Sequence, residues 1–92
     1  MIIRFRHKGL ERLLTRGDTS GVSAQHERKL QQIPAFLNVS QEPADMDLPG
    51  FRLHPLKGGR KGQWVVPVTG NLRIVFEFVG GDATNVDLVD YH

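Results

Sequence analysis

Asn71-Leu-Arg-Ile-Val-Phe-Glu-Phe78 is a stretch in which the residue type alternates from one position to the next. Every second residue is apolar and falls on one face of an extended strand: Leu72, Ile74, Phe76 and Phe78. Successive side chains of a strand point to opposite faces, so this row predicts a central strand that faces the core. Arg73 then projects from the other face. A guanidinium there either pairs with a carboxylate or is held to meet an anion.

Two helices are expected upstream of this strand. Leucines at helical spacing predict a helix over residues 8–16, and Gly17 would cap its C-terminal end. A second helix should start with Ser23 as its N-cap residue. We expect it to end or kink at Pro34, because proline lacks the N–H that the preceding turn needs. Since proline suits the first turn of a helix, residues 34–39 could form a short third helix.

The rest of the chain predicts strands and turns. Residues 2–5 resemble a short strand at a sheet edge, and residues 40–50 resemble a surface loop. Four further strands are expected, joined by short glycine-containing turns that favour antiparallel neighbours: residues 51–56, 63–68, 71–79 and 83–91. Pro67 favours an edge position or a bulge. The predicted class is α+β, with two or three N-terminal helices packed on a four- or five-stranded, mainly antiparallel sheet in a single domain, 1–92.

Composition narrows the possible functions. The chain has 92 residues, which suffice for one domain, and no cysteine for a disulfide or a thiolate metal site. We find no signal peptide and no apolar run long enough to cross a membrane, so we expect a cytoplasmic protein. The net charge is only +2, but residues 51–73 contain five cations and no acid. This segregation favours a polyanionic partner, although an unevenly charged solvated surface gives the same pattern.

Three clusters could carry chemistry. His54 precedes Pro55, and the glycine-rich turn that follows contains Lys57, Arg60 and Lys61; Arg73 lies on the central strand; and Asp90-Tyr91-His92 close the sequence. Together they would supply two imidazoles that exchange protons near neutral pH and fixed cations for phosphate. No metal-ligand spacing and no nucleophile elbow is evident, so no cofactor is expected. Metal-free RNA cleavage needs only such groups, because the 2′-hydroxyl of RNA is itself the nucleophile.

The motifs carrying these residues resemble the HigB toxins of the RelE superfamily. They are Arg52-Leu-His-Pro-Leu-Lys-Gly58, Gly62-Gln63, Asn71-Leu-Arg-Ile74 with Phe76, and Val89-Asp-Tyr-His92, and the likeness in length and element order covers the whole chain. The resemblance implies a ribosome-dependent mRNA endonuclease that cuts codons in the A site of the 70S ribosome. It also implies a HigA-type helix-turn-helix antitoxin as partner. The toxin would contact operator DNA only indirectly, through this antitoxin. Leu72 departs from relatives that often have an aromatic residue there.

By the same resemblance, Lys57 and Arg73 would hold the scissile phosphate and Tyr91 would stack on or pack against the substrate. His54, Asp90 and His92 would transfer protons or orient the groups that do, with the split between acid and base left open. Docking on ribosomal RNA is expected from further cations: Arg4, Arg6, Lys8, Arg12, Arg16, Arg60 and Lys61. The alternatives are a non-catalytic RNA- or ribosome-binding module, which uses the cations only as phosphate contacts, and a structural module with incidental charge.

Overall fold

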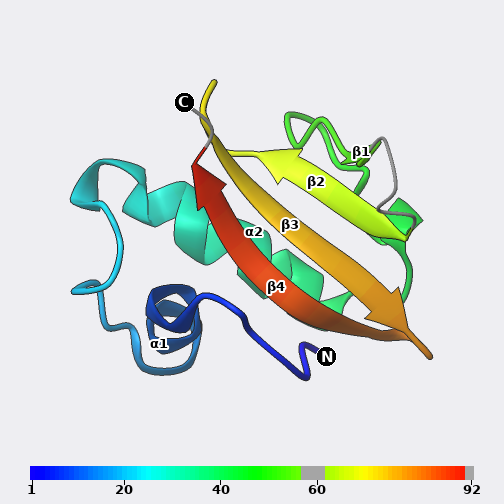
Figure 1. Cartoon of the computed structure of the whole chain (residues 1–92), viewed down its shortest axis with the longest axis horizontal. Coiled ribbons are helices and arrows are strands. Elements are labelled where there is room, and N and C mark those ends of the chain that lie inside the picture. The colour runs from blue at the N-terminus through cyan, green and yellow to red at the C-terminus, as the bar shows by residue number, and fades with distance from the viewer. Residues whose placement is uncertain (57–61, 91–92) are drawn as a thin grey trace.

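The computed structural model describes residues 1–56 and 62–90, and it contains two α-helices, two short 3₁₀ helices and a four-stranded sheet (Figure 1). In chain order the elements are α1 (Lys8–Arg16), η1 (Ala24–His26), α2 (Glu27–Val39), η2 (Pro43–Met46), β1 (His54–Pro55), β2 (Gln63–Pro67), β3 (Leu72–Val79) and β4 (Asp82–Asp90). The strands follow one another in the order β1-β2-β3-β4, and each pair of neighbours is antiparallel. Helix α2 crosses one face of this sheet, which confirms the predicted α+β class (Figure 1).

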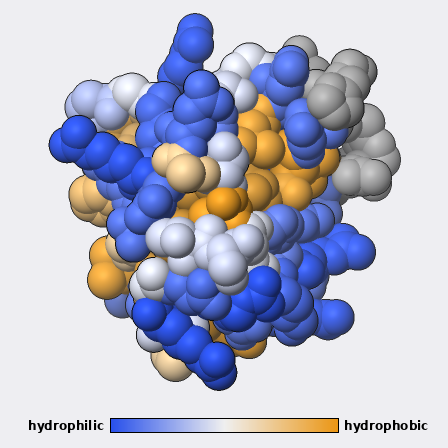
Figure 2. Space-filling view, turned by 90° about the vertical axis from the view of Figure 1, so that its left-hand side faces the viewer, coloured by the Kyte–Doolittle hydropathy of each residue, from blue (hydrophilic) through white to orange (hydrophobic). Residues whose placement is uncertain are grey.

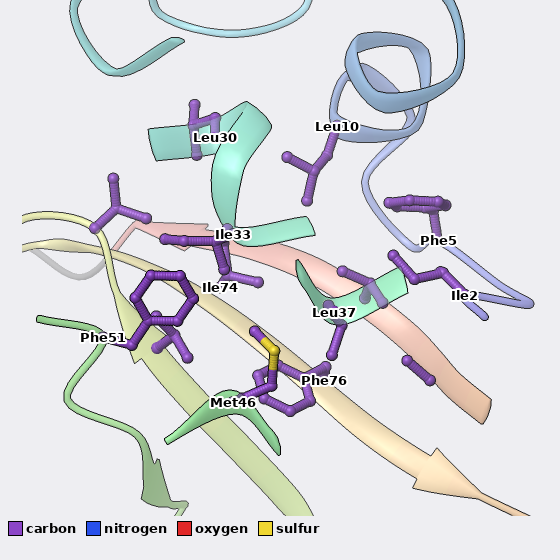
Figure 3. Packing of buried hydrophobic residues seen from close by; sticks show 14 of the residues in the cluster. Ile2, Phe5, Leu10, Leu30, Ile33, Leu37, Met46, Phe51, Ile74 and Phe76 are labelled. Atoms are coloured by element: carbon purple, nitrogen blue, oxygen red, sulfur yellow. The ribbon is translucent and has the colours of Figure 1, made fainter. Parts of the chain in front are cut away.

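Strand β3 lies between β2 and β4 and carries the predicted core-facing row. Phe76 is opposite Trp64 of β2, and Ile74 is opposite both Val66 of β2 and Leu88 of β4. Phe76 and Ile74 are fully buried. They pack in one cluster with residues of α1, α2 and η2 (Figure 3). The alternation that predicted this strand therefore also predicted which of its faces is buried.

Helix α1 has the predicted bounds and the predicted end. Nδ1 of His7 accepts a hydrogen bond from the N–H of Leu10 at 3.0 Å, which caps the start of the helix. Gly17 adopts a left-handed conformation with φ of 67°, which a glycine reaches without strain and which ends the helix. Leu10 and Leu13 are buried against the core. The side of the molecule that carries α1 is largely hydrophilic (Figure 2).

Helix α2 differs from the prediction at Pro34. Ser23 is the N-cap residue of η1, which ends at His26, and α2 then continues without a break to Val39. The expected end of the helix at Pro34 and the separate third helix are therefore wrong. Pro34 lies inside the helix and is buried, as are Ile33 beside it and Leu37 one turn later. Burial of this apolar stripe against the sheet outweighs the one hydrogen bond that proline removes from the helix.

The N-terminal segment joins the sheet at an edge, as predicted, but it does not form a full strand. Ile2 and Phe5 make isolated parallel bridges to Ala83 and Val86 of β4, at the edge of the sheet. The N–H of Ile3 donates to the carbonyl of Ala83 at 2.8 Å. Both bridging side chains are buried in the core. The two contacts lie three residues apart, so the predicted regular strand is reduced to two isolated bridges.

The segment between α2 and β2 contains the largest errors of the prediction. The presumed loop 40–50 includes η2, whose Met46 is fully buried and anchors this segment to the core (Figure 3). The strand expected over 51–56 is reduced to β1. Arg52 has a φ of 54°, a left-handed conformation that interrupts any extended strand just before β1.

The remaining strands start and end within one residue of the prediction. Pro67 is the last residue of β2, beyond the part of that strand that β1 reaches. Its missing N–H is therefore on a locally open edge, as the proline predicted. Strand β4 carries a register shift near Asn85, which has a φ of 51°. This irregularity is a β-bulge that the sequence pattern did not predict.

Candidate functional site

A cleft of about 450 Å³ lies at the end of β2, where the turn to β3 begins. Its lining comes from α2, from the segment before β1, from the β2–β3 turn and from the start of β3: Lys29, Gly50, Arg52, His54, Pro67, Val68, Thr69, Gly70 and Arg73. It brings together His54 and Arg73, which the sequence singled out and which are 19 positions apart. It also contains two cations that had no predicted role in catalysis.

Arg73 projects from the face of the sheet opposite to α2. In the register of the sheet it lies opposite Pro67 of β2 and Val89 of β4, one position out of phase with the core-facing row. Its side chain is partly buried, and its Nε atom is fully buried. A guanidinium whose Nε atom is buried is restricted in orientation, which suits recognition of a tetrahedral anion.

His54 is oriented by the backbone of Arg52. Its Nδ1 lies 3.0 Å from the carbonyl oxygen of Arg52. A carbonyl only accepts, so Nδ1 carries the hydrogen and, in the neutral ring, Nε2 carries the lone pair. The left-handed conformation of Arg52 is the local feature that turns this carbonyl back toward the ring two residues later. The neutral tautomer that the structure favours is therefore one in which Nε2 can accept a proton.

Lys29 is a cleft residue that the sequence did not indicate. It extends from the first half of α2, and its Nζ donates to the carbonyl of Val68 at 3.1 Å, next to the β2–β3 turn. This contact bridges the helix to the end of the sheet, 39 residues further along the chain. Because Arg52 is exposed at the same cleft, three positive side chains line it along with His54. No local sequence signal distinguishes Lys29 from other helical surface lysines.

Asp90 lies at the same end of the sheet but on the other face. It is opposite Leu72 in the register, so it belongs to the row that faces α2, whereas Arg73 belongs to the opposite row. The two side chains are thus neighbours along the sheet end without sharing a face. Five of the predicted residues lie outside the described part of the chain, and their predicted roles are untested: Lys57, Arg60, Lys61, Tyr91 and His92.

The face of the sheet that carries Arg73 has an apolar centre and a second polar cluster. Val65 and Val75 are opposite each other there and are 0% and 6% exposed. One residue row beyond them, Oε2 of Glu77 accepts hydrogen bonds from Nε2 of Gln63 at 3.3 Å and from Nδ2 of Asn85 at 3.2 Å. Two amides thus bind the carboxylate on this face, away from the Arg73 end of the strand. The bulge at Asn85 sets this arrangement, which explains why the sequence did not indicate it.

The predicted docking cations that the structure describes lie apart from the cleft, in the N-terminal segment and on α1. They line two shallow depressions, one with Arg4, Arg6 and Lys8 and the other with Lys8, Arg12 and Arg16. The side that carries α1 shows many protruding hydrophilic side chains (Figure 2). We call these five residues the α1 basic surface.

Acidic neighbours moderate the charge of the α1 basic surface. Nζ of Lys8 lies 3.7 Å from Oε1 of Glu11, and Nε of Arg12 lies 3.7 Å from Oδ2 of Asp18. The pKa of Asp18 is lowered, mainly by hydrogen bonds from Ser20, whose backbone N–H donates at 3.0 Å, and further by the charge of Arg12. These pairs are exposed to solvent, so they neutralise the surface only partly.

The described residues contain neither a cluster of metal ligands nor a membrane-spanning helix. In residues 1–56 and 62–90, no group of three or more histidine, aspartate or glutamate side chains is placed to hold a metal ion. Within the same residues, no helix has the length and apolarity needed to span a bilayer.

Comparison with known proteins gives two findings. Residues 3–92 match the profile of the HigB-like toxin family, described as the RelE-like toxin of the type II toxin-antitoxin system HigB. The chain is also 40% identical to a protein of Proteus vulgaris named Endoribonuclease HigB, over 92 residues that cover 100% of both chains. The match extends over the strands and helices that form the cleft.

Proposed function

Because this chain belongs to the HigB-like, RelE-like toxins of type II toxin-antitoxin systems, we propose that it stops translation by cutting mRNA codons in the ribosomal A site. The protein is an endoribonuclease toxin with an antitoxin partner, as its family and its 40% identical relative indicate. The further proposal concerns where the RNA is cut and which residues cut it. The observation that supports it most is the cleft that both His54 and Arg73 line.

Arg73 neutralises the scissile phosphate in this proposal. As the 2′-oxygen attacks, the phosphorus gains a fifth ligand and the non-bridging oxygens gain negative charge. A guanidinium held by the start of β3 can donate two parallel hydrogen bonds to those oxygens. Lys57, which lies outside the described residues, is assigned the same task on the basis of family resemblance. Lys29 and Arg52 add positive potential along the cleft for the adjoining phosphates.

His54 acts as the general base through Nε2. It takes the proton of the 2′-hydroxyl while the 2′-oxygen forms a bond to phosphorus. The bond from phosphorus to the 5′-oxygen then breaks, and the leaving oxygen takes a proton from a general acid. The products are a 2′,3′-cyclic phosphate and a 5′-hydroxyl end. The hydrogen bond from Nδ1 to the carbonyl of Arg52 supports this assignment, because it leaves Nε2 as the proton-accepting nitrogen.

The general acid is assigned to His92 on the basis of resemblance, with Tyr91 stacking on or packing against the substrate. Asp90 lies at the same end of the sheet as Arg73 but on the opposite face. We therefore assign it to orienting the terminal residues rather than to contact with the phosphate that Arg73 holds. The assignments of Lys57, Tyr91 and His92 concern residues that the structure does not describe.

The α1 basic surface docks on ribosomal RNA in this proposal, together with Arg60 and Lys61. Four of its five cations are exposed, Arg12 is half-buried, and all lie apart from the cleft, so they can bind phosphates without occupying the cutting site. The partners are accordingly the 70S ribosome with its bound mRNA and a HigA-type helix-turn-helix antitoxin in the cytoplasm. Operator DNA would be contacted only through the antitoxin.

The test is single-turnover cleavage of mRNA on ribosomes programmed with a defined A-site codon. We expect Arg73→Ala and His54→Ala to reduce the cleavage rate by about 10²–10³-fold, the range seen when one catalytic donor or acid-base group is removed. Arg28→Ala is the matched control, because Arg28 is an exposed cation on α2 outside the cleft and the α1 basic surface. Folded Arg73→Ala and His54→Ala proteins that cut at the control rate would support the non-catalytic binding module instead.

A further inference from the structure

The β2–β3 turn, residues 68–71, connects the end of β2 to the start of the strand that carries Arg73. It lies at the end of the sheet nearest the start of α2 (Figure 1). Three of its residues line the cleft together with Arg73: Val68, Thr69 and Gly70. The conformation of this turn therefore bears on where Arg73 lies in the cleft.

Leu72, the residue before Arg73, is held by the turn at both of its backbone polar groups. Its carbonyl accepts the N–H of Val68 at 2.7 Å and the N–H of Thr69 at 3.1 Å. Its own N–H donates to Oγ1 of Thr69 at 3.0 Å. Because the carbonyl of Leu72 belongs to the planar peptide unit that joins it to Arg73, these bonds fix the direction in which the Arg73 backbone continues.

Thr69 contributes a side-chain acceptor to this arrangement. Its Oγ1 accepts a second hydrogen bond, from the N–H of Asn71 at 3.3 Å. One hydroxyl oxygen thus binds two consecutive backbone N–H groups, which is the local bonding that serine and threonine provide in turns. Valine resembles threonine in shape but has no oxygen, so valine at this position would remove the acceptor from both N–H groups.

Lys29 holds the same turn from the side of α2. Its Nζ donates to the carbonyl of Val68 at 3.1 Å, and the N–H of Val68 is one of the two that bind the carbonyl of Leu72. The residue next to Lys29 in α2, Leu30, is fully buried in the core. Through Lys29 the turn is therefore bonded to a helix that is itself anchored in the core.

The part of β2 next to Arg73 has less support from the sheet than the middle of that strand. β1 pairs with β2 at Trp64 and Val65, whereas the residue of β2 opposite Arg73 is Pro67, beyond these pairs. This end of β2 is thus a sheet edge, and segments at an edge open more easily than central ones. The hydrogen bonds of Thr69 and Lys29 are formed at this less supported point.

We propose that Thr69 and Lys29 are positioning residues for catalysis, which hold the β2–β3 turn and thereby place the guanidinium of Arg73 against the scissile phosphate. This inference rests on the proposed function, because it takes Arg73 to be the residue that binds this phosphate. Neither side chain needs to touch the reacting atoms in this role. A displacement of about 1 Å can slow a reaction by about 100-fold, so even a small movement of the turn affects the rate.

The test compares Thr69→Val with Thr69→Ser in single-turnover cleavage of A-site mRNA at saturating ribosome concentration. Thr69→Val should cut ~10–100-fold more slowly, because the start of β3 loses its acceptor. Thr69→Ser keeps the oxygen and should cut within ~3-fold of the wild-type rate. The affinity for the programmed ribosome should stay within ~2-fold in both variants, because docking depends on the α1 basic surface.

Thr19→Val is the matched control, since it makes the same change at an exposed threonine outside the cleft. A folded Thr69→Val protein that cuts as fast as Thr19→Val would overturn the role of Thr69. A Thr69→Ser protein that is as slow as Thr69→Val would overturn it as well, because the hydroxyl would then not be the group that matters.

A double-mutant cycle shows whether Thr69 acts through Arg73. If it does, Thr69→Val should change the rate by less than ~2-fold in a protein that already carries Arg73→Ala. A general loosening of the fold, a contact of Thr69 with RNA, or an effect through Asp90, which is opposite Leu72, would each add to the loss caused by Arg73→Ala. An additive loss would therefore refute the proposal.

Lys29→Met keeps the proposal falsifiable if Thr69→Val does not fold, because Lys29 is exposed. The substitution removes the donor to Val68 and should slow cutting by ~3–10-fold at saturating ribosome concentration, without adding to the effect of Arg73→Ala. Arg28→Met is the control at the neighbouring exposed cation. If Lys29 only attracts RNA, its loss will weaken ribosome binding and leave the saturated rate unchanged, which would overturn its positioning role.

The two proposals fail in distinguishable ways. If Arg73→Ala cuts at the wild-type rate, the ribonuclease mechanism of the cleft is wrong and the positioning roles are wrong with it. If Arg73→Ala is slow while Thr69→Val and Lys29→Met cut like their controls, the mechanism stands and only the positioning roles are refuted.

Discussion

Replacing Phe76 by alanine should remove the largest single contribution of β3 to the core. Phe76 is fully buried, and its ring lies edge-on to Phe78 with centroids 5.8 Å apart. Truncating a buried phenylalanine to alanine costs about 3–5 kcal/mol in the free energy of unfolding. For a chain of 92 residues the entropy of unfolding is roughly 0.19 kcal/mol/K, so each kcal/mol lowers the Tm by about 5 °C. The expected decrease in Tm is therefore about 15–25 °C.

Phe36→Ala is the matched control for this experiment. Phe36 is 41% exposed on α2, and its ring lies edge-on to Phe51 with centroids 5.6 Å apart. Truncation there removes one aromatic contact and little buried area, which should cost about 1 kcal/mol, or about 5 °C. Thermal unfolding followed by far-ultraviolet circular dichroism, together with urea denaturation, measures both variants.

The result also separates folding from catalysis. If Phe76→Ala lowers the Tm no more than Phe36→Ala does, the burial of the Phe76 row is wrong and so is the face assigned to Arg73. If the strand assignment is right, Arg73→Ala should keep the free energy of unfolding within about 1 kcal/mol of wild type, because its side chain leaves the opposite face and is only partly buried. Loss of cleavage in that variant then reports on phosphate binding rather than on unfolding.

Three further predictions follow from the surface charges and from the end of the chain. Arg12→Glu and Arg16→Glu should weaken ribosome binding and flatten its dependence on salt, as measured by pelleting at several salt concentrations; a wild-type affinity that does not change with salt would contradict RNA docking. His92→Ala and His92→Gln should both cut A-site mRNA at least ~100-fold more slowly in single-turnover assays while remaining folded, and near-wild-type rates would exclude an acid there. Asp18→Asn should lower the Tm at neutral pH, because the lowered pKa of Asp18 means that its ionised form stabilises the fold; this difference should vanish as the pH falls through that pKa, and a constant difference down to acid pH would refute the linkage.

Periodicity predicted the sheet well because each strand obeys a local rule. The row around Phe76 needs only alternation and burial on one side, and α1 needs only leucines at helical spacing and a glycine after its last turn. The prediction was wrong where tertiary packing overrides a local preference. Pro34 was expected to end a helix, but burial of its neighbours against the sheet keeps the helix intact. Met46 in the presumed loop is a core anchor whose partners lie far away in the sequence.

The cleft illustrates the same limit for function. His54 and Arg73 could be proposed because each stands in a distinctive local context, before a proline and within an apolar strand. Lys29 could not, because it reaches the cleft only through the crossing of α2 over the end of the sheet. The orientation of His54 depends on the left-handed backbone of Arg52, and a non-glycine residue with positive φ has no sequence signature.

The bridges between the N-terminal segment and β4 have a consequence for the order in which the fold forms. Ile2 and Phe5 bridge to Ala83 and Val86, which lie about 80 residues further along the sequence. Closing so long a loop is an entropic cost that must be met before these contacts form, so we expect the N-terminal segment to join the sheet late in folding. The burial of Ile2 and Phe5 therefore depends on β4 being in place, and an opening of β4 would expose both side chains together.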